Sequence, residues 1–243
     1  MTTTVTLHQP YFLPWLGYFA KAAASDYLLL LDKARFRRNH LARVQVLSSS
    51  GAPLWLTCPT GATQGAAIDE VPLPHPDSYV PRFRKTIAQA YGRCPYADET
   101  LPYLDDLLEA FRAAPDLATA NIDSLRVALD FLGIGCTLIR ESSLDLPDER
   151  SEKTVAACDH LDAGVLLVGD GGSVKVHDFG LTSGHALSVE QISFFADHPT
   201  YAQYQRARSG LDFVPGLSHV DALFNLGRDH VRVLLESVPR RPL

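Results

Sequence analysis

Residues 5–21 read Val5-Thr6-Leu7-His8-Gln9-Pro10-Tyr11-Phe12-Leu13-Pro14-Trp15-Leu16-Gly17-Tyr18-Phe19-Ala20-Lys21, and this stretch decides the fold. The threonines and valine from Thr3 to Leu7 favour a short β-strand. The strand is expected to end at Pro10, because proline has no N–H for a β-ladder and restricts the residue before it. Pro14 makes a second break, after which the sequence predicts a helix over residues 15–24. The apolar run from Tyr27 to Leu31 is typical of a buried parallel strand.

Strand, loop, helix and strand in this order form a βαβ unit. Ligands of open α/β sheets bind at the carboxyl ends of the strands. His8 and Gln9 follow the first strand, and Asp32 follows the second. We therefore expect the functional site at this edge of the sheet.

The remaining segments predict an α/β fold with a mostly parallel sheet, flanking helices, a β-hairpin and a helical insertion around 81–132. The hairpin covers residues 44–57, and the insertion contains three apolar stripes at helical spacing. Further strands are expected at 134–140 and 165–168, with a helix from Glu152 to His160 between them. The glycine-rich run 169–173 is expected to be a hairpin turn, because a strand-like segment and not a helix follows it. We expect residues 1–243 to form a single domain.

Composition excludes several classes of protein. The 22 basic and 28 acidic residues give a net charge of −6, which argues against a nucleic-acid coat protein. The four cysteines are scattered without a zinc-ligand spacing, as expected of reduced thiols in the cytosol. The sequence shows neither a signal-peptide pattern nor an apolar run of the roughly 20 residues that a membrane span needs. We therefore expect a cytoplasmic protein with no membrane partner, no metal and no cofactor. The oligomeric state is not defined by the sequence.

Five positive charges fall between Lys33 and Arg43. One interpretation is a solvated loop whose arginines pair with surface carboxylates. The other, which we favour, is an anion site in which Arg37, Arg38 and Arg43 hold a phosphate, because arginine forks match that group. Near the C-terminus, Ser218 is expected to cap a helix that carries Asp221 and Asn225 on one face. A site-facing role and a purely structural role are equally supported for these three residues.

His8 is the histidine with the clearest reason to lie at a site. At a strand end it can act as a general base or be a satisfied structural residue. The histidines at 75, 160, 177, 185, 198, 219 and 230 lie in segments expected to be exposed loops or helix surfaces, and they form no HxxxH metal pair. No GxSxG elbow is present. Cys58 and Cys94 lack the basic surroundings that activate a thiolate, apart from Arg93 beside Cys94.

A family resemblance rests on the opening pattern His8-Gln9-Pro10-x-x-Leu13-Pro14-Trp15-x-Gly17-x-Phe19-x-Lys21, followed by Asp26 and Asp32. Later fragments include Trp55-Leu56-Thr57, Asn121, Leu132-Gly133-Ile134, Ser218, Asp221 and Phe224-Asn225. Together they resemble the WbqC-like protein family. The sequence departs from the pattern at Cys58 and His40. Members of that family are encoded in bacterial polysaccharide and natural-product gene clusters, so the resemblance implies a biosynthetic role.

Two classes of function follow. The first is a transferase that moves an activated acyl or aminoacyl group onto the amine of an amino sugar or natural-product intermediate. His8 or Asp32 would deprotonate the amine, Gln9 and Asn39 would orient the carbonyl, and the arginines would hold a phosphate-bearing donor. That donor is a nucleotide sugar, an acyl-adenylate, a coenzyme A thioester or the acceptor end of an aminoacyl-tRNA. The motif residues Tyr11, Trp15 and Lys21, with Ser218, Asp221 and Asn225, complete the expected substrate-binding set. The alternative is a nucleotidyl-transfer-like enzyme or a non-catalytic nucleotide- or carbohydrate-binding protein.

Overall fold

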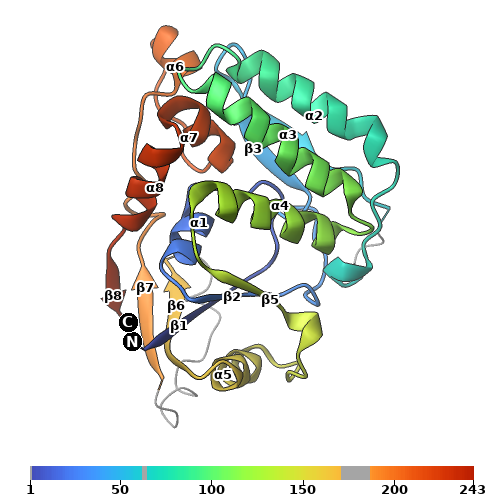
Figure 1. Cartoon of the computed structure of the whole chain (residues 1–243), viewed down its shortest axis with the longest axis vertical. Coiled ribbons are helices and arrows are strands. Elements are labelled where there is room, and N and C mark those ends of the chain that lie inside the picture. Colours follow the sequence, from blue (N-terminus) through green and yellow to red (C-terminus); the bar gives the residue numbers. More distant parts are fainter. Residues whose placement is uncertain (1, 62–64, 171–186) are drawn as a thin grey trace.

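The computed structural model describes residues 2–61, 65–170 and 187–243. A six-stranded sheet runs through its lower half in the order β5-β2-β1-β6-β7-β8 (Figure 1). Five strands are parallel: β1 (Thr3–His8), β2 (Tyr27–Leu30), β5 (Thr137–Arg140), β6 (Ala163–Gly169) and β7 (Ser188–Ile192). The edge strand β8 (Arg240–Pro242) is antiparallel to β7. The predicted α/β fold with a mostly parallel sheet is confirmed.

Strand β1 is the centre from which the sheet is built in both directions. It pairs on one side with β2, where Val5 lies opposite Tyr27 and His8 opposite Leu30. On the other side it pairs with β6, and the Thr6 hydroxyl donates to the Leu167 carbonyl at 2.7 Å. The chain therefore leaves β1 toward β2 and β5 and returns to β6 on the opposite side. This reversal makes the carboxyl ends of β1 and β6 the topological switch point, where ligands of such sheets bind.

Helices cover both faces of the sheet (Figure 1). On one face lies α1 (Leu16–Ala23), which packs against α8 (Arg228–Glu236) and belongs to the main core of the protein. The opposite face is covered by α5 (Arg150–His160). Its smaller apolar cluster comprises Val5, Cys158, Leu166 and Val168. Both faces of β1 are thus buried, which explains the unbroken apolar runs in the neighbouring strands.

The upper half of Figure 1 contains the helical insertion and the hairpin. The three predicted helices are α2 (Pro76–Tyr91), α3 (Ala97–Ala113) and α4 (Leu117–Leu132). Helix α2 begins five residues before the predicted start because proline is well suited to the first helical position. The hairpin of β3 (Arg43–Leu47) and β4 (Pro53–Thr57) forms a separate antiparallel sheet. Short 3₁₀ turns cover Ile68–Glu70 (η1) and Glu141–Ser143 (η2).

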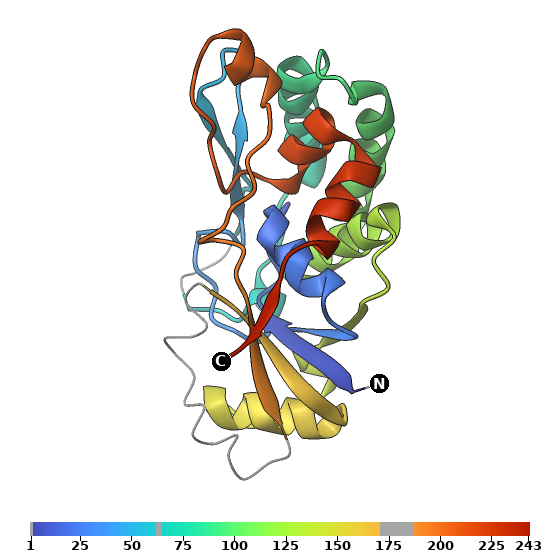
Figure 2. The ribbon, with the colours of Figure 1, turned by 90° about the vertical axis from the view of Figure 1, so that its left-hand side faces the viewer.

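The C-terminal segment returns across the molecule beside the hairpin (Figure 2). It contains α6 (Tyr204–Arg208) and α7 (His219–Leu226) before α8. The predicted cap is confirmed, because the Ser218 side chain accepts a hydrogen bond from the Val220 N–H. The predicted strand over 134–140 is observed only from Thr137, since the Ile134 N–H still bonds the end of α4 through the Leu129 carbonyl. Residues 171–173 of the predicted turn lie outside the described residues.

Across the described ranges, we find no helix of the length and apolar character that a membrane crossing requires.

Candidate functional site

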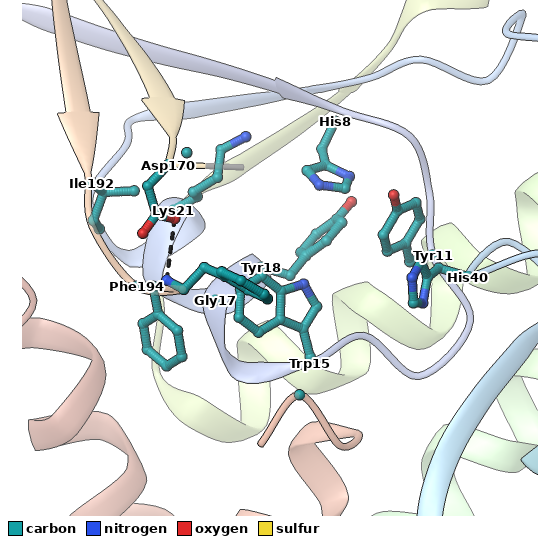
Figure 3. Close-up of a pocket in the computed structure, with 13 residues that line it drawn as sticks. His8, Tyr11, Trp15, Gly17, Tyr18, Lys21, His40, Asp170, Ile192 and Phe194 are labelled. Atoms are coloured by element: carbon teal, nitrogen blue, oxygen red, sulfur yellow. Dashed lines mark hydrogen bonds between the residues drawn. The ribbon is translucent and has the colours of Figure 1, made fainter. Parts of the chain in front are cut away.

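A cavity of about 270 Å³ opens at the switch point (Figure 3). It is lined by the ends of three parallel strands, through His8 of β1, Gly169 of β6 and Ile192 of β7. The first turns of α1 supply Gly17, Tyr18 and Lys21. The site therefore lies where the order of the strands predicts it. We refer to it as the main cavity.

Aromatic rings form much of its wall. The His8 ring lies 4.5 Å from the ring of Tyr11 and 4.4 Å from that of Tyr18, measured between centroids. His40 stacks on Tyr11 at 5.2 Å. Trp15 lies against Gly17 so closely that a Cβ atom added to this glycine would be 2.3 Å from the indole. The glycine in the opening motif is thus needed to let the indole lie over the start of α1.

His8 is held as a neutral hydrogen-bond acceptor. Its Nδ1 lies 2.9 Å from the Gln9 carbonyl oxygen, which can only accept, so the ring proton belongs on Nδ1 and Nε2 is left with a lone pair. Burial, followed by the nearby charge of Lys21, lowers the pKa of His8 to about 3. A group with this pKa is unprotonated at neutral pH but is a weak base. The geometry suits orientation of a substrate N–H or O–H.

Lys21 is a buried amine at the same strand ends. Its side chain is 6% exposed, and its ammonium donates to the Leu7 carbonyl at 3.1 Å. Its Cδ would be 3.6 Å from a Cβ built on Gly169, so the side chain lies close to β6 as well as to β1. No carboxylate among the described residues lies within ion-pair distance of it. Burial lowers the pKa of Lys21 to about 8, which leaves a fraction of the amine neutral at physiological pH.

Asp170 lies at the rim of the main cavity, on the side across from Tyr11 and His40 (Figure 3). Its carboxylate accepts hydrogen bonds from the Phe195 N–H at 3.1 Å and the Ala196 N–H at 2.8 Å. These bonds hold the turn that follows β7. The turn buries Phe194 against Trp15, with 5.4 Å between the ring centroids, and leaves Phe195 70% exposed at the mouth.

Asp32, expected beside His8, lies elsewhere. Its fully buried carboxylate binds the Arg140 Nε at 2.8 Å, the Ser142 N–H at 2.9 Å and the Ser142 hydroxyl at 2.6 Å. These partners belong to the end of β5 and to η2. Asp32 therefore joins the ends of β2 and β5 and does not line the main cavity.

The binding residues predicted in the basic loop are likewise separate from His8. Arg37, Arg38 and Asn39 are exposed, and the Asn39 side chain accepts from the Leu41 N–H at 3.3 Å. Arg43 places its guanidinium 4.0 Å from the centre of the Trp55 ring. None of these four residues lines the main cavity. Gln9 meets the site through its carbonyl oxygen, which also accepts from the Tyr18 hydroxyl at 3.2 Å.

Asp221 and Asn225 organise the C-terminal segment. The buried Asp221 carboxylate accepts from the hydroxyls of Tyr91 and Tyr201 at 2.9 and 2.7 Å and from Gln203 at 3.1 Å. The Asn225 side chain accepts from the Tyr204 N–H at 2.8 Å.

Ser218 pairs with Trp15 in an isolated antiparallel bridge. It touches the site through that bridge alone, because neither it nor Asp221 or Asn225 lines the main cavity.

The prediction for His219 is wrong, because this histidine is fully buried. Its Nδ1 lies 2.8 Å from the Pro14 carbonyl oxygen and its Nε2 lies 2.6 Å from the Tyr103 hydroxyl. It joins α7 to α3 and to the motif loop. Asn121 has a similar role, since its amide donates to the carbonyls of Pro10 and Leu41 at 2.9 Å each. Both residues shape the loop that carries Tyr11.

Sequence reasoning missed several residues of the wall. Tyr18 was detectable, because it lies three residues before Lys21 and therefore shares its helical face. Asp170, Phe194 and Phe195 carry no local signal, since they reach the site only because β6 and β7 lie beside β1.

The described residues support neither a metal site nor an activated cysteine. Within residues 2–61, 65–170 and 187–243 no three His, Cys, Asp or Glu side chains are grouped as a metal site requires. Burial raises the pKa of the Cys58 thiol to about 11 and those of the other three cysteines to about 12, so none is a ready thiolate.

Comparison with known proteins identifies the family of the chain. Residues 9–233 match the WbqC-like protein family. The match begins one residue after His8 and takes in the rest of the opening motif. The chain therefore belongs to that family. It is also similar to "Uncharacterized protein Rv1507c" of Mycobacterium tuberculosis (strain ATCC 25618 / H37Rv), with 23% identity over 229 residues. The match covers 93% of this chain and 94% of the relative.

Proposed function

We propose that this member of the WbqC-like protein family is a biosynthetic transferase that joins an activated acyl or aminoacyl group to the amine of an amino sugar or natural-product intermediate. The observation that carries the proposal is Lys21, a buried amine with a pKa of about 8 at the topological switch point. A lysine tuned to this range is suited to accepting and returning a proton near neutral pH.

The reaction needs a nucleophilic amine. The acceptor arrives mainly as an ammonium and must lose a proton before it attacks. Neutral Lys21, roughly a tenth of the population at pH 7 for a pKa of about 8, takes that proton on Nζ. The free acceptor amine then donates a hydrogen bond to Nε2 of His8. This bond turns the lone pair of the amine nitrogen toward the acyl carbon. His8 thus orients the acceptor, a change from the expected general-base role.

The bond changes balance without a further reactant. A C–N bond forms between the acceptor and the acyl carbon, and the bond from that carbon to the oxygen or sulfur of the donor breaks. The leaving group carries away the electron pair and receives the proton held by Lys21. The second proton of the acceptor nitrogen, lost as the amide forms, is released to bulk water. The rings of Tyr11, Trp15 and Tyr18 line the main cavity, and an apolar wall of this kind slows hydrolysis of an activated acyl group.

One observation favours a second candidate, a carbohydrate- or nucleotide-binding protein without catalysis. The two carboxylates nearest the strand ends, Asp32 and Asp170, are both occupied by hydrogen bonds within the protein. What remains at the cavity is mainly aromatic surface, on which rings of sugars or bases stack.

Amide formation separates the two candidates. The purified protein is incubated with amino sugars and with acyl-coenzyme A, acyl-adenylate or aminoacyl-tRNA donors, and products are identified by mass spectrometry. We expect an amide product that Lys21→Met reduces by at least a hundredfold with the fold retained. Lys85→Met is the matched control, because Lys85 is exposed on α2. Binding without product would favour the second candidate, and equal turnover by Lys21→Met would remove Lys21 from the reaction.

A further inference from the structure

A second hollow of about 40 Å³ adjoins the main cavity. The two share four lining residues, which are Tyr11, Trp15, His40 and Gly216. From there the second hollow extends to the hairpin, where Gln45 and Trp55 line it. Figure 2 shows that the hairpin and the C-terminal segment run alongside each other in this region. The surface beside Trp55 is therefore continuous with the reaction site.

Trp55 is prepared for a planar ligand. Its side chain is 42% exposed although it belongs to a paired strand. The Arg43 guanidinium lies 4.0 Å from the centre of the indole ring and covers one face of it. The Nε of Arg43 is buried and has no hydrogen-bond partner among the described residues. Stacking between an indole and a guanidinium gives a rigid, cationic platform of the type on which nucleobases stack.

Positive charge is available on Arg43 itself and on the loop that carries His40, which lines both the main cavity and the second hollow. Arg37 and Arg38 are exposed, and no carboxylate of the described chain lies within ion-pair distance of them or of Arg43. In the same loop Lys33 does have such a partner, Asp69, at 2.9 Å. The whole chain carries a net charge of −6. A group of unpaired arginines in an acidic protein is complementary to a phosphate.

We propose that the exposed surface of Trp55, at the rim of the second hollow, binds the nucleoside phosphate portion of the donor. The base stacks at Trp55, the phosphate faces Arg37, Arg38 and Arg43, and the acyl end enters the main cavity. The last of these placements rests on the proposed transferase function, whereas binding of a nucleotide does not. Acyl-adenylates, nucleotide sugars, coenzyme A and the 3′ end of tRNA share this chemistry.

The two tryptophans of the chain make the proposal measurable, because both line the second hollow. Trp15→Phe leaves Trp55 as the single indole, and Trp55→Phe leaves Trp15. Each variant is titrated with AMP while tryptophan fluorescence is recorded. We expect AMP to quench Trp55 in the Trp15→Phe protein, and adenosine to quench it more weakly. No quenching of Trp55 by AMP at millimolar concentrations, or quenching of Trp15 alone, would overturn the proposal.

Calorimetry measures how much individual side chains contribute to the affinity for AMP. We expect Trp55→Leu to weaken AMP binding by roughly tenfold or more, because base stacking on an aromatic side chain is lost. Arg37→Ala with Arg38→Ala should weaken it further, with a larger effect at low salt. Arg82→Ala is the matched control, since Arg82 is exposed on α2. Wild-type affinity in the Trp55→Leu protein, or in the protein lacking both arginines, would overturn the proposal.

Further titrations distinguish the possible donors and separate the nucleotide-site proposal from the transferase proposal. Titration with coenzyme A, UDP and a CCA trinucleotide ranks the possible donors, and inorganic phosphate tests whether the base is needed. Tight binding of phosphate alone, unaffected by Trp55→Leu, would contradict a nucleotide site. An acyl thioester without a nucleotide tests the transferase separately, because it can form the amide in the main cavity even if nothing binds beside Trp55.

Discussion

Replacing Lys21 with methionine should stabilise the protein at neutral pH. The side chain is 6% exposed, and the structure gives its ammonium one hydrogen bond, to the Leu7 carbonyl. Burial lowers the pKa of Lys21 from 10.5 to about 8. A fall of about 2.5 in pKa corresponds to a cost of about 3 kcal/mol for holding the charged form in the folded state. Methionine fills nearly the same volume without the charge.

The net effect is smaller because methionine also loses the hydrogen bond. A bond from a charged donor contributes about 1.5–3 kcal/mol, so the net gain in the free energy of unfolding at pH 7 is about 1 kcal/mol. For a chain of this length that gain raises Tm by about 2–4 °C. The gain indicates that the sequence retains a charge at a site where stability alone would favour an apolar residue.

The pH dependence of the stability difference between wild type and Lys21→Met tests whether the buried charge of Lys21 is its cause. Below pH 8 the folded and unfolded forms both carry a protonated Lys21, so the full cost is present in the wild-type protein. Between pH 8 and 10.5 the folded form loses its proton first, and wild-type stability rises relative to Lys21→Met. Thermal melts of both proteins from pH 6 to 10.5, with Lys85→Met as control, measure this difference. A Lys21→Met protein that is less stable at pH 7, or an advantage that does not shrink above pH 8, would refute the reasoning.

Three further predictions follow from other contacts. His8→Gln should keep the rate of amide formation within about tenfold of wild type, because glutamine retains a hydrogen-bond acceptor, whereas His8→Ala should lose more. Equal losses of rate in the two variants would instead assign proton transfer to His8. Asn121→Ala should lower the free energy of unfolding by about 2–4 kcal/mol, since two buried carbonyls lose their donor, and urea titration measures it. Burial raises the pKa of Asp221 to about 6, so wild-type stability should fall by about 3 kcal/mol as pH rises from 4 to 6. Asp221→Asn should show no such fall in pH-dependent melts, and a fall of similar size there would assign it to another group.

Local sequence patterns specify the βαβ unit around which the protein is built. The prolines at 10 and 14 and the apolar runs beside them are local signals, because they act through backbone geometry and through the burial of one element. They were enough to predict β1, α1 and β2 and the position of His8 at a strand end, and equally local patterns predicted the hairpin and the three insertion helices. The resemblance of the opening motif to the WbqC-like protein family also depended on residues that are adjacent in sequence.

The chemistry of those residues depends on the distant segments that pack against them. Asp32 follows its strand as predicted, yet its carboxylate is used by Arg140 and Ser142, which are more than a hundred positions away. Lys21 acquires its low pKa because its side chain is buried over the ends of β1 and β6, and no periodicity within residues 15–24 encodes the pairing of those two strands. Sequence patterns report which side of an element is buried, whereas a pKa or a cavity depends on what distant segment does the burying.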